Sequence, residues 1–386
     1  MTPVVAGFWL ALALVAYTYL VYPALLALAV ALRRRPPRPA GYFEGTAAVV
    51  LAAYNEQQAI DRRVRELARQ LADSGLAGEV IVVSDGSTDR TAELARAVGE
   101  RVRVIELAEH QGKSAALNEG AAAAQTDLLI FADARQTWAP EAMRRLADNF
   151  TDPSIGAVSG DVVIDAPPGP VSGMLLYWEF EKWIRRQEGR LHSTIGVSGS
   201  ICAVRRERFR PMPPRMILDD VYWPMQVVMQ GLRVVHDESA RAFDRLPGRT
   251  RDEFRRKVRT LCGNFQLLAW LPAALLPWRN PVWWQFISHK VLRLLVPWAL
   301  LTLLVTSALL EGTPYRVALV AQVAAYGIAM AGLWNAVSAR SRLAGAAASF
   351  VVLNAAAWAA FWVWASGGTH RAWGKIAYEP GLSEPT

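Results

Sequence analysis

The chain has 386 residues, of which 53% are hydrophobic, and its net charge is +8 at pH 7. Two cysteines, Cys202 and Cys262, are too few for a disulfide framework and indicate a reducing compartment. The basic excess does not indicate nucleic-acid binding, because the arginines alternate with acids or flank apolar segments; lipid headgroups and an anionic substrate account for it.

The N-terminal segment predicts a membrane anchor. Residues 4–32 contain no charged side chain, and this run is longer than the ~20 residues that cross a bilayer. A cleaved signal peptide is the alternative, but the segment lacks a basic start and a small-residue cleavage site. Basic residues 33–35 follow the run and favour the cytoplasmic side, so we expect residues 1–35 to be an uncleaved anchor with its N-terminus outside.

Apolar runs alternate with helical patterns between residues 45 and 250, after a proline-rich linker at 36–40. We expect strands at 47–53, 79–84, 101–106 and 127–132, with helices at 57–72, 89–98 and 110–124. This alternation predicts an α/β domain with a mostly parallel sheet and helices on both faces. Further on, the pattern indicates one or two strands at 155–165, an amphipathic helix at 173–190, an extended stretch at 195–204 and a helix from Asp219.

The C-terminal third returns to the membrane. Residues 251–285 form an amphipathic, basic pattern that we expect to lie on the membrane surface, and residues 286–368 should hold about three spans, near 290–310, 315–337 and 345–366. His289 is interpreted as an interface anchor, with contact to phosphate or lipid headgroups as the alternative. The basic loop at 339–342 is expected on the cytoplasmic side, which leaves the C-terminus outside.

Acidic residues stand at the ends of three predicted elements: Asp85, Asp133 and the pair Asp219-Asp220. Each could be a helix cap or a turn former. The first two follow apolar strands, however, and such strand ends meet at one edge of a parallel sheet, where ligands bind. Carboxylates there suit Mg²⁺ or Mn²⁺ with a diphosphate, and a further carboxylate can act as general base. With the arginine-rich pattern at 255–259, this predicts group transfer from a nucleotide diphosphate carrier to a hydroxyl.

The order of these motifs resembles the family 2 glycosyltransferases. The residues that carry the resemblance are Ala53-Tyr54-Asn55-Glu56, Ser84-Asp85-Gly86-Ser87-Thr88-Asp89, Gly112-Lys113-Ser114-Ala115-Ala116-Leu117-Asn118, Asp133-Ala134-Arg135 and Leu218-Asp219-Asp220. The similarity covers about residues 45–260 and is strongest to the membrane-embedded synthases of cellulose, chitin, hyaluronan and poly-N-acetylglucosamine. It implies a GT-A fold, a cytoplasmic catalytic domain at 45–250, and an inverting transfer from a nucleotide sugar, commonly UDP-linked.

The resemblance also implies roles for single residues. Those matching nucleoside or nucleotide positions are Tyr54, Glu56, Asp85 and Lys113. Asp133 matches the first acid of the family's D-x-D motif, which meets the metal and the diphosphate. Asp220 matches the catalytic base, with Asp219 in place of the usual glutamate, and Arg259, with Arg256 before it, matches the family's Q-x-x-R-W region.

Two departures from the family pattern affect these expectations. Arg135 stands where the second metal carboxylate is expected, so the arginine would compensate electrostatically or the metal would be held more weakly. Thr260 replaces the tryptophan that lies under the acceptor sugar in processive synthases, which bears on whether the product is a polymer.

We therefore expect a multi-pass enzyme of the cell (inner) membrane that transfers a sugar from a nucleotide sugar to an acceptor hydroxyl, in polysaccharide synthesis, with Mg²⁺ or Mn²⁺ as cofactor. One alternative is transfer of a single sugar to a lipid acceptor such as a polyprenyl phosphate or glycolipid. An alternative of another class is a non-catalytic membrane scaffold that binds nucleotide sugars. The expected partners are the nucleotide sugar, a sugar or lipid acceptor and membrane lipids, but no nucleic acid.

Overall fold

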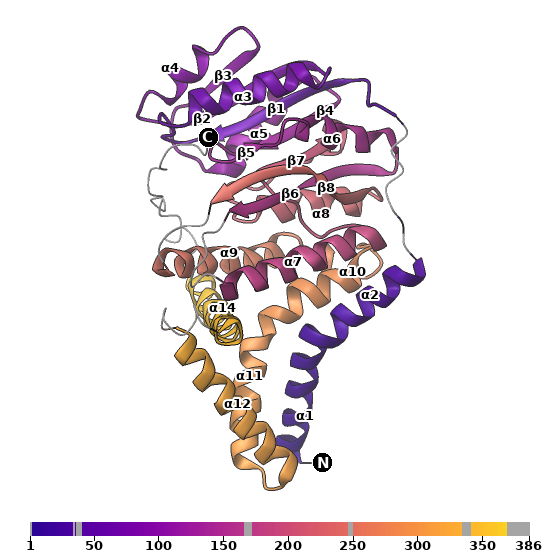
Figure 1. Ribbon diagram of the computed structural model, residues 1–386, viewed down its shortest axis with the longest axis vertical. Helices are drawn as coiled ribbons and strands as arrows, with labels where there is room; N and C mark the ends of the chain where they lie inside the picture. Colours follow the sequence, from indigo (N-terminus) through magenta and orange to yellow (C-terminus); the bar gives the residue numbers. More distant parts are fainter. Residues whose placement is uncertain are drawn as a thin grey trace.

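A computed structural model describes residues 2–33, 35, 41–165, 172–245, 250–333 and 341–368. The predicted linker at 36–40, Arg34, and residues 339 and 340 of the predicted basic loop lie outside these ranges. The molecule has three layers: a sheet with flanking helices, a layer of helices lying across its lower side, and a bundle of apolar helices beneath (Figure 1).

The sheet has eight strands in the order β3-β2-β1-β4-β7-β6-β8-β5. The first four strands in this order are parallel, as the alternating pattern predicts. The second half is mixed, because β7 runs antiparallel to both β4 and β6 while β6 and β8 are parallel. The strands are β1 Thr46–Ala53, β2 Ala77–Asp85, β3 Val102–Leu107, β4 Leu128–Ala132, β5 Thr137–Trp138, β6 Ile155–Asp165, β7 Ile201–Arg205 and β8 Arg233–Arg245.

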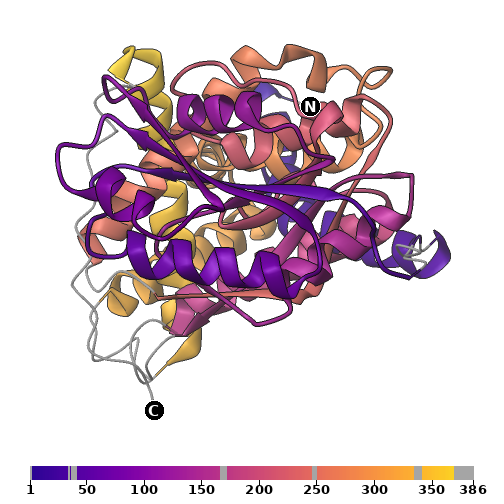
Figure 2. The same ribbon diagram turned by 90° about the horizontal axis from the view of Figure 1, so that it is seen from above.

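Helices cover both faces of the sheet (Figure 2). They are α3 Ile60–Asp73, α4 Thr91–Arg96, α5 Lys113–Ala123, α6 Ala142–Asp148 and α8 Asp219–Met229. Alternate side chains of the central strands enter two separate cores, as the two-residue period of a strand requires. Val50 and Ile81 pack with the α5 and α8 side, whereas Val49 and Val80 pack with the α3 and α6 side.

Two long helices, α7 Ser172–Leu191 and α9 Thr250–Trp270, lie between the sheet and the apolar bundle (Figure 1). The predicted amphipathic segment at 173–190 forms a helix, and α9 covers the first part of the predicted amphipathic segment at 251–285. Gly263 of α9 packs against Ile217 and Leu218, because a Cβ there would come within 2.8 Å of both side chains. The layer thus contacts the segment that leads directly into α8.

In the described ranges, four helices are long and apolar enough to cross a membrane: Pro3–Arg33, Trp283–Leu309, Thr313–Gly332 and Leu343–Ala365. Within them the elements are α1 Pro3–Ala16, the π-helical turn η1 Tyr17–Val21, α2 Tyr22–Arg33, α10 Trp283–Phe286, the π-helical turn η5 Ile287–Val291, α11 Leu292–Leu309, α12 Thr313–Gly332 and α14 Arg342–Ala365. The second of the four begins at Trp283, earlier than the predicted start near 290, because α10 and η5 continue directly into α11.

Candidate active site

Asp85 ends β2 and fixes the loop in front of α5. Its Oδ1 accepts the backbone N–H of Gln111 and its Oδ2 that of Gly112, both at 2.8 Å, and His110 Nδ1 lies 2.9 Å from Oδ2. The carboxylate is 2% exposed, so it is a buried anion compensated by these donors. Asp85 thereby determines where α5, and with it Lys113, begins.

The same turn explains Gly86. Its φ is +65°, and a Cβ at this position would lie 2.4 Å from the backbone nitrogen of His110. A side chain is excluded both by the left-handed backbone and by the close approach of the 109–110 segment. Tyr54, which follows β1, stacks on the His110 ring with 4.0 Å between ring centroids. The ends of β1 and β2 and the loop before α5 are therefore packed together.

Asn55 and Glu56 continue this edge. Asn55 has a φ of +53° and accepts the backbone N–H of Thr88 through its side-chain oxygen, at 2.8 Å. The backbone N–H of Glu56 donates to Thr91 Oγ1, also at 2.8 Å. These bonds tie the turn after β1 to the turn after β2, as expected for neighbouring parallel strands that end together.

Lys113 joins two of the acidic positions that the sequence indicates. Its Nζ lies 2.7 Å from Asp133 Oδ1 and 3.6 Å from Asp219 Oδ2. Asp133 follows β4 and Asp219 begins α8, so the ammonium group connects the end of a strand to the start of a helix that is distant in sequence. Burial alone would lower the pKa of Lys113, but the charges of Asp133 and Asp219 raise it above its ordinary value, so the side chain stays positive.

Asp219 and Asp220 form the first turn of α8, where the helix dipole favours negative charge. Burial raises the pKa of Asp220 to about 6, and the neighbouring Asp219 charge adds to this, while Arg185, Lys290 and Lys113 act in the opposite direction. Burial also raises the pKa of Asp219. Because burial and a neighbouring negative charge both raise its pKa, the Asp220 carboxylate is suited to accept a proton near neutral pH.

The loop before β7 leaves room around this pair. The backbone N–H of Val197 donates to the Asp220 carbonyl at 2.8 Å. A Cβ on Gly199 would lie 3.4 Å from Lys113 Nζ and 3.5 Å from Asp220 Cβ. Gly199 therefore lies directly against both groups. The sequence indicated this stretch only as an extended, small-residue segment.

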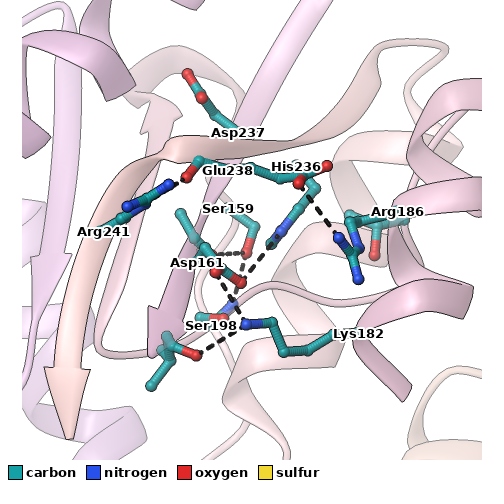
Figure 3. A network of polar contacts seen from close by, with 12 residues as sticks. Ser159, Asp161, Lys182, Arg186, Ser198, His236, Asp237, Glu238 and Arg241 are labelled. Carbon is teal, nitrogen blue, oxygen red and sulfur yellow. Dashed lines mark hydrogen bonds and ion pairs between the residues drawn. The ribbon is translucent and has the colours of Figure 1, made fainter. Parts of the chain in front are cut away.

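A buried network holds that loop from behind (Figure 3). Ser198 donates its backbone N–H to Ser159 Oγ at 2.9 Å. Next to it, Asp161 lies between Lys182 Nζ, at 2.9 Å, and His236 Nε2, at 3.5 Å. Burial opposes the charge of Asp161, but His236 and Lys182 keep its pKa below the ordinary value, so it remains ionised. The loop thus rests on β6, α7 and β8.

Arg135, which stands where the second metal carboxylate was expected, is directed to a different acid. Its guanidinium is directed to Asp244 of β8, at 3.9 Å, and Gln136 donates to the same carboxylate at 2.9 Å. The strand β8, which the sequence did not indicate, supplies this acid. Arg135 is 37% exposed, and it borders the site next to Asp133.

Arg256 and Arg259 lie on α9, and Arg259 is one turn before Gly263. Residues separated by three or four positions share a helix face, so these arginines lie on the side of α9 that packs under Ile217 and Leu218. Both are partly buried.

The donor set allows one protein carboxylate for a divalent cation. No group of three or more His, Cys, Asp or Glu side chains in the described ranges is close enough to share a metal ion. Asp133 Oδ1 is bonded to Lys113, and its side chain is 31% exposed. Mg²⁺ usually keeps several waters and binds one or two carboxylates together with substrate phosphates. The residues present therefore fit a cation that shares Asp133 with a bound diphosphate.

Three polar groups below the site form a cluster that the sequence did not indicate. Glu181 and Glu188 of α7 enclose His289, whose Nδ1 lies 2.8 Å from Glu188 Oε1 and whose Nε2 lies 3.0 Å from Glu181 Oε2. His289 is 3% exposed, so the interpretation as an interface anchor, and the alternative of a headgroup contact, are wrong. Its partners are distant in sequence, and no local pattern could reveal them.

Comparison with known proteins assigns the fold and the domain. Residues 48–211 match the family model "Glycosyl transferase family 2". The chain is 26% identical over 246 residues to the poly-beta-1,6-N-acetyl-D-glucosamine synthase of Staphylococcus aureus (strain COL), which covers 61% of this chain and 58% of that protein. It is 35% identical over 104 residues to the undecaprenyl-phosphate 4-deoxy-4-formamido-L-arabinose transferase of Pseudomonas aeruginosa (strain LESB58), covering 26% of this chain and 31% of that protein.

The chain therefore spans less than two thirds of the length of these curated relatives. Among solved structures, that of the mannosyltransferase PcManGT from Pyrobaculum calidifontis in complex with GDP-Man and Mn²⁺ superposes with a TM-score of 0.70 at 22% identity, over 93% of this chain and 99% of that chain. This likeness extends through the membrane helices as well as the sheet. The structure has the GT-A fold, and residues 48–211 of this chain match glycosyl transferase family 2.

Proposed function

We propose that this chain transfers a sugar, with inversion, from a nucleotide diphosphate sugar to an acceptor hydroxyl at the membrane. The observation that carries the proposal is the linked set of Asp133, Lys113, Asp219 and Asp220 at one edge of the sheet. In this set, the positive charge of Lys113 acts on Asp220, a carboxylate whose pKa is raised. The family 2 domain and the nucleotide sugar named for PcManGT support the donor class.

Each residue in the set has a distinct task in this proposal. Asp220 takes the proton of the acceptor hydroxyl as that oxygen attacks the anomeric carbon. Lys113 offers a positive charge to the departing nucleoside diphosphate, and Asp133 positions the Lys113 ammonium. Arg259, Arg256 and Arg135 are proposed to contact phosphate, because a guanidinium pairs well with it. Tyr54, Glu56 and Asp85 are proposed to form the nucleoside side, where Asp85 acts by fixing the 110–112 loop.

A divalent cation is proposed as the cofactor, with Asp133 as its protein ligand. When bound, such an ion stabilises the charge that develops on the leaving diphosphate. The Mn²⁺ named for PcManGT supports this choice. The donor sugar itself is proposed to be UDP-linked, by resemblance to the family.

The acceptor is the point on which two versions of this function differ. Polymer synthesis is supported by the similarity to a poly-beta-1,6-N-acetyl-D-glucosamine synthase. Transfer of one sugar to a lipid is supported by the similarity to an undecaprenyl-phosphate transferase and by Thr260, which replaces the tryptophan of processive synthases. The product length separates the two versions.

We also propose that the protein is a multi-pass protein of the inner membrane, with the sheet domain in the cytoplasm and the N-terminus outside. The four apolar helices support a membrane location. Nucleotide sugars are cytoplasmic metabolites, and basic residues 33–35 follow the first helix. Protease accessibility of tags at the N-terminus and in the 166–171 segment tests the orientation.

The substitution Asp220→Asn tests the proposed function. It should lower transfer about 10²–10⁴-fold, the usual contribution of a general base, while the affinity for the nucleotide stays the same. Nucleotide release from a panel of nucleotide sugars gives the rate, and thermal unfolding with added nucleotide gives the binding. Unchanged turnover in this variant excludes Asp220 as the base. Nucleotide-sugar binding without turnover in the unsubstituted chain favours the scaffold alternative instead.

A further inference from the structure

Helix α7 presents one charged face to the start of the second apolar helix. Glu181 and Glu188 of this face both contact His289, and Glu181 also pairs with Arg293. A residue that is four positions after Glu181 and three positions before Glu188 lies on the same helix face as both. Arg185 is that residue, so it projects between the two glutamates toward the η5 turn, where Lys290 follows His289.

The short contacts of the two glutamates are made with other groups than these cations. Glu188 accepts the hydroxyl of Tyr22 at 2.7 Å as well as its contact with His289, and Glu181 is bonded to His289 and Arg293. Within the described part of the chain, the side chains of Arg185 and Lys290 make no hydrogen bond or ion pair. Both are partly buried, and their positive charges repel each other. Glu181, Glu188 and Asp220 act on Lys290 electrostatically, but within the described residues neither cation has an anion in direct contact. A phosphate placed between the two cations would reduce their mutual repulsion.

The position of this pair relative to Asp220 indicates which anion. The charges of Arg185 and Lys290 both act on the Asp220 carboxylate. They reach it from α7 and from the end of an apolar helix, whereas Lys113 and Asp133 reach the acidic pair from α5 and β4. The donor's diphosphate is expected on the side of Lys113, so the anion at Arg185 and Lys290 belongs to the other substrate, which comes from the membrane.

We propose that Arg185 and Lys290 hold the phosphate of a lipid acceptor and so place its accepting hydroxyl beside Asp220; this rests on the proposed function. The hydroxyl is the P–OH group of a lipid monophosphate or an alcohol next to the phosphate. Its oxygen forms the bond to the anomeric carbon, and its proton passes to Asp220. The bond from that carbon to the diphosphate oxygen breaks, and its electron pair leaves on the nucleoside diphosphate. A guanidinium and an ammonium group together match a phosphate by geometry and charge.

Binding of farnesyl phosphate, with farnesol as the uncharged control, tests this site without need of turnover. The full chain is purified in neutral detergent, and affinities are taken from the shift of the unfolding midpoint with ligand concentration. Farnesyl phosphate should bind at least tenfold more tightly than farnesol or inorganic phosphate. Arg185→Gln and Lys290→Gln should each weaken farnesyl phosphate about tenfold, the value of one charge-assisted contact, and leave nucleotide affinity unchanged.

The matched control is Arg186→Gln, which removes one positive charge from the same helix. Arg186 is paired with Glu238 at 3.3 Å, so its loss should leave farnesyl phosphate binding as it was. Arg185→Lys and Lys290→Arg keep the charges and should retain most of the affinity, which separates a charge effect from misfolding. Equal binding of farnesol, or unchanged binding in both glutamine variants, overturns the proposal. So does an equal loss of nucleotide affinity, which would assign the pair to the donor.

A transfer assay separates this inference from the proposed function. Nucleotide sugar is supplied with farnesyl phosphate, phosphatidylglycerol or neutral diacylglycerol as acceptor. We expect transfer to a phosphate-bearing acceptor, with KM raised about tenfold in the two glutamine variants and kcat less affected. Transfer to diacylglycerol with an equal KM refutes the phosphate site and leaves the glycosyltransferase function standing. Specific farnesyl phosphate binding without turnover of any nucleotide sugar refutes the function and leaves the site standing.

Discussion

The charge on Asp219 should set the pH at which Asp220 becomes active. With a pKa of about 6, Asp220 is about 9% ionised at pH 5 and about 91% ionised at pH 7. A general base must be ionised, so the transfer rate should rise about tenfold over this interval and then level off. The groups that face Asp220 are Asp219, which raises its pKa, and Arg185, Lys290 and Lys113, which lower it.

Asp219→Asn removes the adjacent negative charge but keeps an oxygen that can accept from Lys113. The pKa of Asp220 should therefore fall, and the acid limb of the rate profile should move to lower pH by on the order of one unit, or about 1.4 kcal/mol. Lys113→Gln removes a positive charge and should move the same limb to higher pH. Opposite shifts are the specific signature, because a general loss of structure would move both profiles the same way.

The assay is nucleotide release at saturating nucleotide sugar, measured from pH 4.5 to pH 8 in buffers of constant ionic strength. Asp237→Asn serves as a control, since Asp237 lies outside the site and accepts from Asn149. A profile that does not change between pH 5 and pH 7 refutes the assignment of Asp220 as the titrating base. A shift of the same sign in both variants refutes the electrostatic origin of its pKa.

Three further substitutions have expected outcomes. Asp133→Asn should raise the Mn²⁺ concentration needed for nucleotide-dependent stabilisation, measured by titrating the metal; an unchanged requirement would remove Asp133 as its ligand. Gly86→Ala should destabilise the fold by more than Gly75→Ala in thermal unfolding, because both have positive φ but only Gly86 faces backbone, at 2.4 Å. Lys182→Met leaves Asp161 buried without the ammonium group and should lower the free energy of unfolding by about 3 kcal/mol. The double variant Lys182→Met with Asp161→Asn should recover part of that loss. An equal loss in the single and double variants contradicts the pairing.

The strand and helix pattern predicted the first half of the sheet because β4 is apolar throughout and β1 and β2 contain long apolar, buried runs. Asp85 and Asp133 therefore lie at the same edge of the sheet, at the ends of β2 and β4, with β1 between these two strands. The antiparallel insertion of β7 and the strand β8 were not predicted, since β8 carries many polar residues and its pairing depends on distant partners. Asp244, the ion-pair partner of Arg135, lies near the end of β8, so that contact also could not be predicted.

The acidic positions could be predicted from sequence, but the cations that act on them could not. Lys113 was indicated by resemblance as a residue near the nucleotide, yet its bridge between Asp133 and Asp219 depends on how α5 and α8 meet. Arg185 and Lys290 belong to segments that look like ordinary interfacial and membrane helices. Neither side chain makes an ion pair within the part of the chain that the structure describes, and this depends on the folded arrangement rather than on any local pattern.

The two π-helical turns have a consequence for which lipid acceptors the enzyme can use. Tyr17 of η1 is joined to Ser288 of η5 at 2.9 Å and to Trp284 at 2.9 Å, and Glu188 connects α7 to both apolar helices through Tyr22 and His289. These contacts hold α7 against the apolar helices, so if those helices cross a bilayer as proposed, we expect the sheet domain and Asp220 to stand at one height above it. An acceptor must then present its hydroxyl at that one depth, so we expect selection among lipids by the length of the linker between tail and hydroxyl as much as by headgroup chemistry.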